Sequence, residues 1–357
     1  MAYTTIDDGS EYFHTQLYTG TGSELSVTNG ANAGDFKPDW IWIKQRNAGS
    51  TDHGMFDSSR GVTKNIKTNV TDAQSTEAQS VKTFNTDGFT LGTSGDYNGS
   101  SDTHAAWQWK ANGGTRTTNT ESGNNPAGGF QANTTAGFSI VDYTGTGSAG
   151  TMAHGLGAVP HMILFKARSE ADNDWAVYHQ GNTSAPETDF LRLNTTGVTT
   201  DNANFMNDTA PTSSVFTVGT GSKVNSDGET YIAYCFTEKQ GYSKFGGYTA
   251  NNNANGPFIY LGFKPKYLVI KKTSAAGEWH IFDTTREPTG NPIDQDLYAS
   301  GNYAEGSDAS FVDFLSNGFK LRANHTSING EDTSQTYIYM AFGETFVSSK
   351  GVPTTAR

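Results

Sequence analysis

Three short stretches of this 357-residue chain share one pattern, and they decide the fold. They read PDWIWIK (38–44), PHMILFK (160–166) and PKYLVIK (265–271). In each of them a proline precedes a run of apolar or aromatic residues that ends in a lysine. Proline suits the start of a strand, where no ladder donor is needed. An unbroken apolar run is typical of a strand that is buried on both faces, so we predict three such strands.

Four further landmarks recur in the same order around these strands. Upstream lies a Tyr-Thr-Gly turn, at 18–20 and 143–145, which becomes Tyr-Thr-Ala at 248–250. Downstream comes a second strand, which reads HGMFD (53–57), WAVYH (175–179) and WHIFD (279–283). A strand centred on Phe follows, as DGFTL (87–91), SVFTV (214–218) and NGFKL (317–321). Each series ends on an aromatic strand, THAAWQW (103–109), TYIAYCF (230–236) or TYIYMAF (336–342). An ordered series that recurs three times indicates internal repetition.

The spacing of the repeats sets the predicted domain organisation. A repeat of about 105 to 120 residues is too long for a solenoid unit and has the size of a β-sandwich. We therefore predict an all-β chain of three tandem homologous β-sandwiches of jelly-roll or concanavalin-like type. Their predicted limits are 11–112, 130–240 and 241–347, with a Gly/Asn/Thr-rich linker at 113–129 and terminal arms at 1–10 and 348–357.

Two local expectations follow from this division. The flexible composition of residues 111–126 predicts that the first unit is insulated from the others, whereas the short join near Gly241 predicts rigid packing of the second unit on the third. The polar segment 71–81 is the one stretch that we predict to be a short helix.

Composition excludes several classes of protein. The 21 Phe, 16 Tyr and 6 Trp argue against disorder, because they supply apolar surface that can offset the entropy of ordering. A formal net charge of −12 disfavours nucleic-acid partners. Cys235 is the single cysteine, so no intramolecular disulfide is possible, and we expect it to be a small core residue. The opening MAYTTIDDGS does not resemble a signal peptide, and no window has the apolar length of a membrane span, so we expect synthesis in a cytoplasm and no membrane insertion.

Two near-identical motifs, FDSSR (56–60) and FDTTR (282–286), are candidate binding sites. An Asp followed three residues later by an Arg could bind a ligand carboxylate or a pair of sugar hydroxyls. It could equally be an Asx-type turn whose arginine pairs back with the aspartate, and we favour this interpretation. The middle repeat has His179 and Gly181 instead, so no chemistry common to the three repeats needs the pair.

The remaining polar residues show no catalytic or metal-binding spacing. The eight histidines are His14, His53, His104, His154, His161, His179, His280 and His325, and none forms an H-x-H or H-x₃-H pair. The loops 201–204 and 251–253 could offer oxygens to Ca²⁺, but they lack the spacing of a calcium loop, and we expect solvated turns. We therefore predict no catalytic residue, no metal and no cofactor.

The six tryptophans could stack on sugar rings or fill the core. Trp40, Trp42, Trp175 and Trp279 stand where the repeats have apolar residues, and Trp107 and Trp109 share one face of their strand. Core packing is the interpretation that we favour for all of them.

The quoted motifs resemble those of a family that is abundant in marine bacteriophages. The likeness covers almost the whole chain and includes MAYTTIDD, PDWIWIK, FDSSRG, GFSIVDYTGTG, HGLG, APTSSVFTVG, TYIAYCF, GYSKFG, IFDTTR, VDFLSNGFKLR, TYIYMAFGE and PTTAR. Members of that family are described as tail-fibre-like or virion structural proteins.

The resemblance implies a non-enzymatic protein on the virion surface that serves attachment as a tail-fibre or receptor-binding component. Its expected partners are other virion proteins of the tail or capsid and a host cell-surface glycan, and we expect a homo-oligomer, a trimer if the protein is a fibre tip. Two alternatives stay open, namely a capsid decoration protein and a polysaccharide depolymerase. The resemblance identifies no ligand-binding residue.

Overall fold

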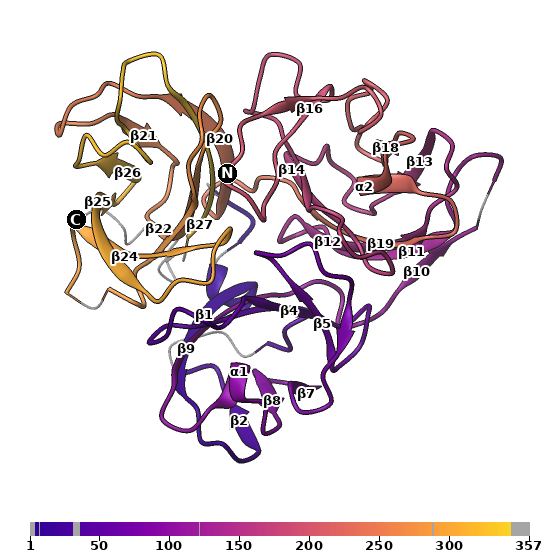
Figure 1. Cartoon of the computed structure of the whole chain (residues 1–357), viewed down its shortest axis with the longest axis horizontal. Coiled ribbons are helices and arrows are strands. Elements are labelled where there is room, and N and C mark those ends of the chain that lie inside the picture. The colour runs from indigo at the N-terminus through magenta and orange to yellow at the C-terminus, as the bar shows by residue number, and fades with distance from the viewer. Residues whose placement is uncertain (1–3, 7, 31–35, 121, 288, 344–357) are drawn as a thin grey trace.

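The computed structural model describes residues 4–6, 8–30, 36–120, 122–287 and 289–343. It is nearly all β, with 42% of residues in strands and 3% in helices, which confirms the prediction of an all-β chain. The chain forms three lobes at the corners of a triangle (Figure 1). Lobe 1 holds strands β1 to β9, lobe 2 holds β10 to β19 and lobe 3 holds β20 to β27. The predicted arm 348–357 lies outside the described residues, as do residues 1–3 and 7 of the predicted arm 1–10.

Lobe 1 pairs a six-stranded sheet with a three-stranded sheet. The larger has the order β1-β9-β3-β4-β5-β6, and the smaller has the order β2-β8-β7. The elements are η1 (Gly9–Glu11), β1 (Phe13–Thr19), β2 (Leu25–Val27), β3 (Trp40–Gln45), β4 (Gly54–Asp57), β5 (Lys64–Lys67), β6 (Ser75–Thr76), β7 (Val81–Phe84), β8 (Phe89–Leu91), α1 (Gly95–Asn98) and β9 (Thr103–Trp109).

Lobe 2 also has a six-stranded sheet, in the order β10-β11-β12-β19-β14-β15, and two small two-stranded sheets, β13-β18 and β16-β17. Its elements are β10 (Thr117–Asn119), β11 (Gly128–Asn133), β12 (Phe138–Thr144), β13 (Gly150–Ala153), β14 (Met162–Ala167), β15 (Ala176–His179), β16 (Asp189–Phe190), β17 (Thr200–Asp201), β18 (Val215–Val218), α2 (Ser222–Asn225) and β19 (Thr230–Phe236).

Lobe 3 is one continuous eight-stranded sheet in the order β20-β27-β22-β23-β24-β25-β26-β21. Its strands are β20 (Ser243–Thr249), β21 (Phe258–Tyr260), β22 (Pro265–Lys272), β23 (Trp279–Asp283), β24 (Ile293–Tyr298), β25 (Gly306–Leu315), β26 (Gly318–Leu321) and β27 (Thr336–Gly343). The sheet curls so far that its two edge strands approach each other. Lys244 on the edge strand β20 donates to the carbonyl of Tyr260 on the opposite edge strand β21.

The three predicted apolar strands, β3, β14 and β22, are buried on both faces. Every residue of β3 and β14 is buried, and so is every residue of β22 except Lys266. Alternate side chains of β3 point to opposite sides, as the pleat requires. Trp40 and Trp42 join a central core that all three lobes share, whereas Ile41 and Ile43 join a core inside lobe 1. Each lobe thus has a private core and contributes one sheet face to the common core.

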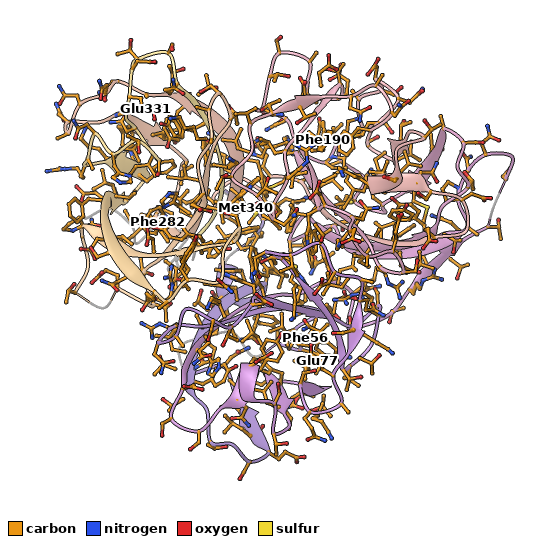
Figure 2. All side chains as sticks on the ribbon, in the orientation of Figure 1. Phe56, Glu77, Phe190, Phe282, Glu331 and Met340 are labelled. Atoms are coloured by element: carbon orange, nitrogen blue, oxygen red, sulfur yellow. The ribbon has the colours of Figure 1, made fainter. Side chains whose placement is uncertain are left out.

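Aromatic rings from different lobes meet in the central core. Trp40 of lobe 1 stacks on Tyr234 of lobe 2 with their centroids 4.6 Å apart, and Phe236 lies 6.1 Å from Phe342 of lobe 3. Figure 2 shows Met340 of lobe 3 near the point where the three lobes meet. The closing strands β9, β19 and β27 turn their alternate residues Trp107 and Trp109, Tyr234 and Phe236, and Met340 and Phe342 to one buried face.

Two local expectations are wrong. Residues 71–81 form no helix, because their backbone groups pair with other segments, and the amide of Gln74 donates to the carbonyl of Arg168 in lobe 2. Residues 111–126 do not insulate lobe 1. They contain β10, which joins the sheet of lobe 2, while lobe 1 packs directly on both other lobes in the central core.

Candidate functional site

The FDSSR motif lies at the junction between lobes 1 and 2. Asp57, the last residue of β4, forms an ion pair with Arg60, and both side chains are 0% exposed. The Arg60 amide donates to Asp57 Oδ1 at 2.8 Å, which closes an Asx-type turn. Tyr234 of lobe 2 donates its hydroxyl to Asp57 Oδ2 at 2.7 Å. Burial alone would lower the pKa of Arg60, but Asp57 more than offsets this, and the pKa lies above its usual value.

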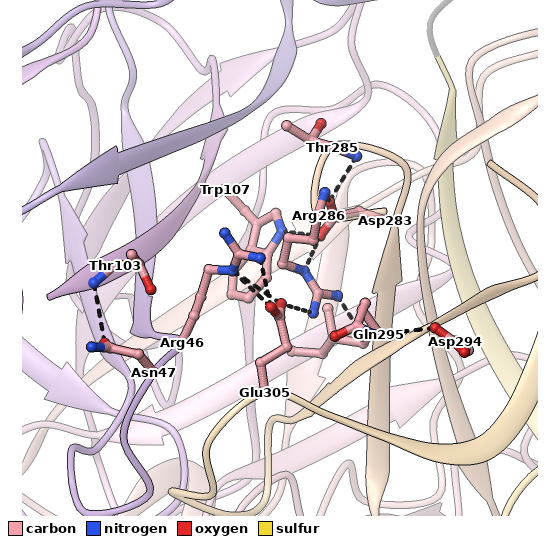
Figure 3. A network of polar contacts seen from close by, with 11 residues as sticks. Arg46, Asn47, Thr103, Trp107, Asp283, Thr285, Arg286, Asp294, Gln295 and Glu305 are labelled. Atoms are coloured by element: carbon pink, nitrogen blue, oxygen red, sulfur yellow. Dashed lines mark hydrogen bonds and ion pairs between the residues drawn. The ribbon is translucent and has the colours of Figure 1, made fainter. Parts of the chain in front are cut away.

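The FDTTR motif has the same structure at the junction between lobes 3 and 1 (Figure 3). Asp283, the last residue of β23, pairs with Arg286, and both are again 0% exposed. The indole of Trp107 in lobe 1 donates to Asp283 Oδ2 at 3.1 Å. Glu305 adds a bridge, since it accepts from Arg286 at 2.9 Å and from Arg46 of lobe 1 at 2.6 Å.

His179 is at the corresponding place between lobes 2 and 3. It is the last residue of β15, and its Nε2 lies 3.0 Å from the carbonyl oxygen of Tyr339 in lobe 3. Its Nδ1 accepts the Gly181 amide at 3.0 Å, so the ring is neutral and Nε2 carries the proton. Burial lowers the pKa of His179 to about 4.

These contacts show why lobe 2 can have His179 where lobes 1 and 3 have Asp57 and Asp283, since each residue bonds to a neighbouring lobe. The three cross-lobe bonds run from lobe 1 to 2, from 2 to 3 and from 3 to 1, so they close a ring. The Asp-Arg motifs form the turn that we favoured from sequence, and their complete burial leaves no access for an external ligand. The two motifs instead form hydrogen bonds that hold neighbouring lobes together.

Three buried lysines had no role in the sequence interpretation beyond marking the repeat. Lys44, Lys166 and Lys271 end the apolar runs, and their ammonium groups bind backbone carbonyls. Two of these bonds cross lobes, from Lys166 to Thr71 at 3.0 Å and from Lys271 to Thr196 at 3.0 Å. Burial lowers the pKa of Lys44 and Lys166 to about 8 and that of Lys271 to about 7. The recurrence of a lysine at the end of each apolar run was the sequence signal that could have indicated that these lysines are buried.

The histidines are dispersed over the molecule. His53, His104, His154, His179 and His280 are buried, whereas His14, His161 and His325 are partly exposed. Burial lowers the pKa of His53, His104 and His154. Within the described ranges, no three His, Cys, Asp or Glu side chains are grouped so that they could hold a metal ion. Among the same residues, no helix has the length and apolar character needed to cross a membrane.

The other candidates fall into the core or into exposed turns. All six tryptophans are at most 1% exposed, which confirms their core assignment. Cys235 is buried in the private core of lobe 2, as predicted, and burial raises the pKa of its thiol well above the usual value. The loops 201–204 and 251–253 are exposed turns whose side-chain oxygens accept internal bonds, such as that from the Asn253 amide to Asn251 Oδ1 at 3.1 Å.

Two depressions hollow the surface of lobe 2. A depression of about 310 Å³ is lined by Asn119 of β10, Met152 of β13 and Val215 of β18, and another of about 330 Å³ lies between the turns at 123–124, 144–148 and 227–228. Uncharged polar and small side chains dominate both linings. These depressions contain no pair of carboxylates and no nucleophile beside a base.

Fold and site together define an all-β protein whose three lobes share one core. The chain belongs to the family described as domain of unknown function DUF7483, whose model matches residues 8–345 and so covers all three lobes as one unit. No curated protein matches the chain.

Proposed function

We propose that this protein is a structural and binding component of a phage virion surface that serves attachment. The observation that carries the proposal is the closed ring of lobes around one shared aromatic core. A body of this kind holds its outer loops in fixed relative positions, which suits a module that binds through several loops at once. The motif resemblance to marine phage structural proteins supports the location.

We further propose that the three lobes are copies of one β-sandwich unit. In its support, the closing strand lies between equivalent neighbours in each sheet: β9 between β1 and β3, β19 between β12 and β14, and β27 between β20 and β22. The register agrees as well, because the lysines that end the apolar runs lie opposite the third residue of the closing strand in every lobe. These residue pairs are Lys44 and Ala105, Lys166 and Ile232, and Lys271 and Ile338.

A buried asparagine supports the same proposal. Asn98, Asn225 and Asn329 each lie just before the closing strand and are 0% exposed. Their side-chain oxygens accept a backbone amide from the turn that follows β1, β12 or β20, and the donors are Thr21, Thr146 and Asn251 at 2.8, 2.8 and 2.9 Å. The tyrosine that begins this turn donates its hydroxyl to the carbonyl just before each asparagine at 2.7 Å. Three long-range networks with the same geometry are hard to explain without duplication.

Capsid decoration is the second candidate, and the ring of lobes favours it. Three similar lobes in a ring give one chain an approximate threefold symmetry, which matches a threefold position on a shell. A fibre tip would instead need three chains, and hence nine lobes, around one axis.

Imaging of purified particles tests both candidates. Antibody against the purified chain, followed by single-particle reconstruction, should place a three-lobed density on the virion. Density at threefold positions of the head would support decoration, and density at the tail tip would support receptor binding. Absence of the protein from particles that are otherwise complete would overturn the proposal.

A further inference from the structure

Strand β21 exposes two aromatic rings to solvent. Phe258 is 45% exposed and Tyr260 is 56% exposed, whereas Ile259 between them is buried in the private core of lobe 3. Because alternate side chains share a face, both rings point outward from one strand, about 6–7 Å apart along it. Figure 1 shows β21 and its neighbour β26 on the side of lobe 3 away from the other lobes.

The fold itself does not require aromatic residues here. Strands β2, β13 and β21 each pair with the Phe-centred strand of their lobe. One apolar residue of each lies opposite the central Phe, and these residues are Val27, Met152 and Ile259. The residues on either side of it are Ser26 and Thr28 in lobe 1, Thr151 and Ala153 in lobe 2, and Phe258 and Tyr260 in lobe 3. Two lobes thus keep small residues at the outward positions where lobe 3 has large rings. A function specific to lobe 3 explains this difference better than packing does.

Two lysines lie beside these rings in a protein of net charge −12. Lys244 Nζ lies 5.5 Å from the centroid of the Tyr260 ring and donates to the Tyr260 carbonyl at 3.0 Å. Lys320 lies opposite Phe258 on β26. Lys264, in the connection from β21 to β22, is exposed as well. The strand therefore forms an aromatic, locally basic site on an acidic molecule.

We propose that this site, formed by Phe258, Tyr260, Lys244 and Lys320, binds an acidic polysaccharide. The aromatic faces would stack on the apolar faces of successive sugar rings, and the ammonium groups would bind their carboxylate or sulfate groups. The bond from Lys244 to the Tyr260 carbonyl occupies part of the strand edge, which disfavours an added peptide strand. The inference rests on the attachment role proposed above, for which it names a ligand class and a place.

Binding of defined polysaccharides to the purified full chain tests the site. The probes are dextran, dextran sulfate and alginate, which separate neutral, sulfated and carboxylated chains, and the readout is biolayer interferometry at low salt. We expect binding of at least one of the two acidic probes, weaker binding of dextran, and loss of the difference at high salt. No binding of either acidic probe would overturn the proposal.

The decisive variant gives lobe 3 the residues of lobe 1. Phe258→Ser with Tyr260→Thr should weaken binding by about tenfold, which corresponds to about 1.4 kcal/mol for the two lost stacking contacts together. Lys244→Gln should reduce the preference for acidic over neutral chains. Tyr303→Ser removes another exposed aromatic ring of lobe 3 and should bind as the unchanged protein does.

Thermal melting shows whether the variants remain folded. Unchanged binding by a folded Phe258→Ser, Tyr260→Thr protein would overturn the site. If the protein binds acidic polysaccharide but is absent from virions, the site stands and the attachment role fails. If it is present on virions but binds neither acidic probe, the site alone fails.

Discussion

Asp57 and Asp283 end strands β4 and β23 just as His179 ends β15, yet two junctions carry a buried ion pair and the third a neutral imidazole. The hydrogen-bond partners of these three residues in the neighbouring lobe also differ. The carboxylates accept from the side chains of Tyr234 and Trp107, whereas the same strand position in lobe 3 is Met340, which has no hydrogen to donate. His179 instead donates to the backbone carbonyl of Tyr339. The shared feature is a polar bond across each junction, and its chemistry follows the partner.

Loss of a central aromatic should have the largest effect and should reach every lobe. Trp109→Ala removes a ring that contacts Phe13, Trp40, Tyr267 and Phe342, and should lower the free energy of unfolding by about 3–5 kcal/mol. Since the core is common, hydrogen exchange should accelerate on β22 of lobe 3 as well as on β3. The control is Tyr260→Ala at the exposed edge, which should leave the melting temperature unchanged. Acceleration confined to lobe 1 would show that the lobes unfold separately.

Breaking one ion pair should cost almost as much. Asp57→Ala strands the Arg60 cation and the Tyr234 hydroxyl in the core, and should destabilise the fold by about 3–5 kcal/mol in urea unfolding. The triple variant Asp57→Leu, Arg60→Met, Tyr234→Phe removes the three polar side chains together and should regain part of that loss, because the residue 60 amide and the Met55 carbonyl still lose their partners.

A surface pair provides the matched control. Asp313 pairs with Arg322, whose side chain is half exposed, so Asp313→Ala should cost less than about 1 kcal/mol. A loss for Asp57→Ala no larger than that of the control would show that the junction pair is not important for cohesion.

The sequence predicted buried strands and local turns, but not how the lobes assemble. Apolar runs such as 40–43 predict a strand buried on both faces, and the Asp-Arg spacing predicts a local turn, because both depend on neighbours along the chain. The stacking of Trp40 on Tyr234 depends on how separate sheets pack, and no local pattern encodes that. The predicted helix at 71–81 failed for the same reason, since a polar segment takes the structure that satisfies its backbone, and here lobe 2 supplies a partner. The exposed rings of β21 stand out only when the strand register shows which residues of the other lobes they replace.

The smallest effect that we expect is specific to the third junction and depends on pH. His179 has a folded-state pKa of about 4, below the ordinary value near 6.5, because burial opposes the charged ring. Between these values the unfolded chain binds more protons than the folded one, so stability should fall as the pH falls from about 6.5 to 4. Physically, a proton on Nδ1 would meet the Gly181 amide hydrogen that Nδ1 now accepts. His53, His104 and His154, whose pKa values burial also lowers, act in the same direction. The informative quantity is therefore the difference between the unchanged protein and His179→Gln, whose amide can still donate to Tyr339. That variant should lose up to about 3 kcal/mol less stability between pH 7 and pH 4 in urea unfolding. Parallel pH profiles for the two proteins would mean that the imidazole takes up its proton without opening the junction between lobes 2 and 3.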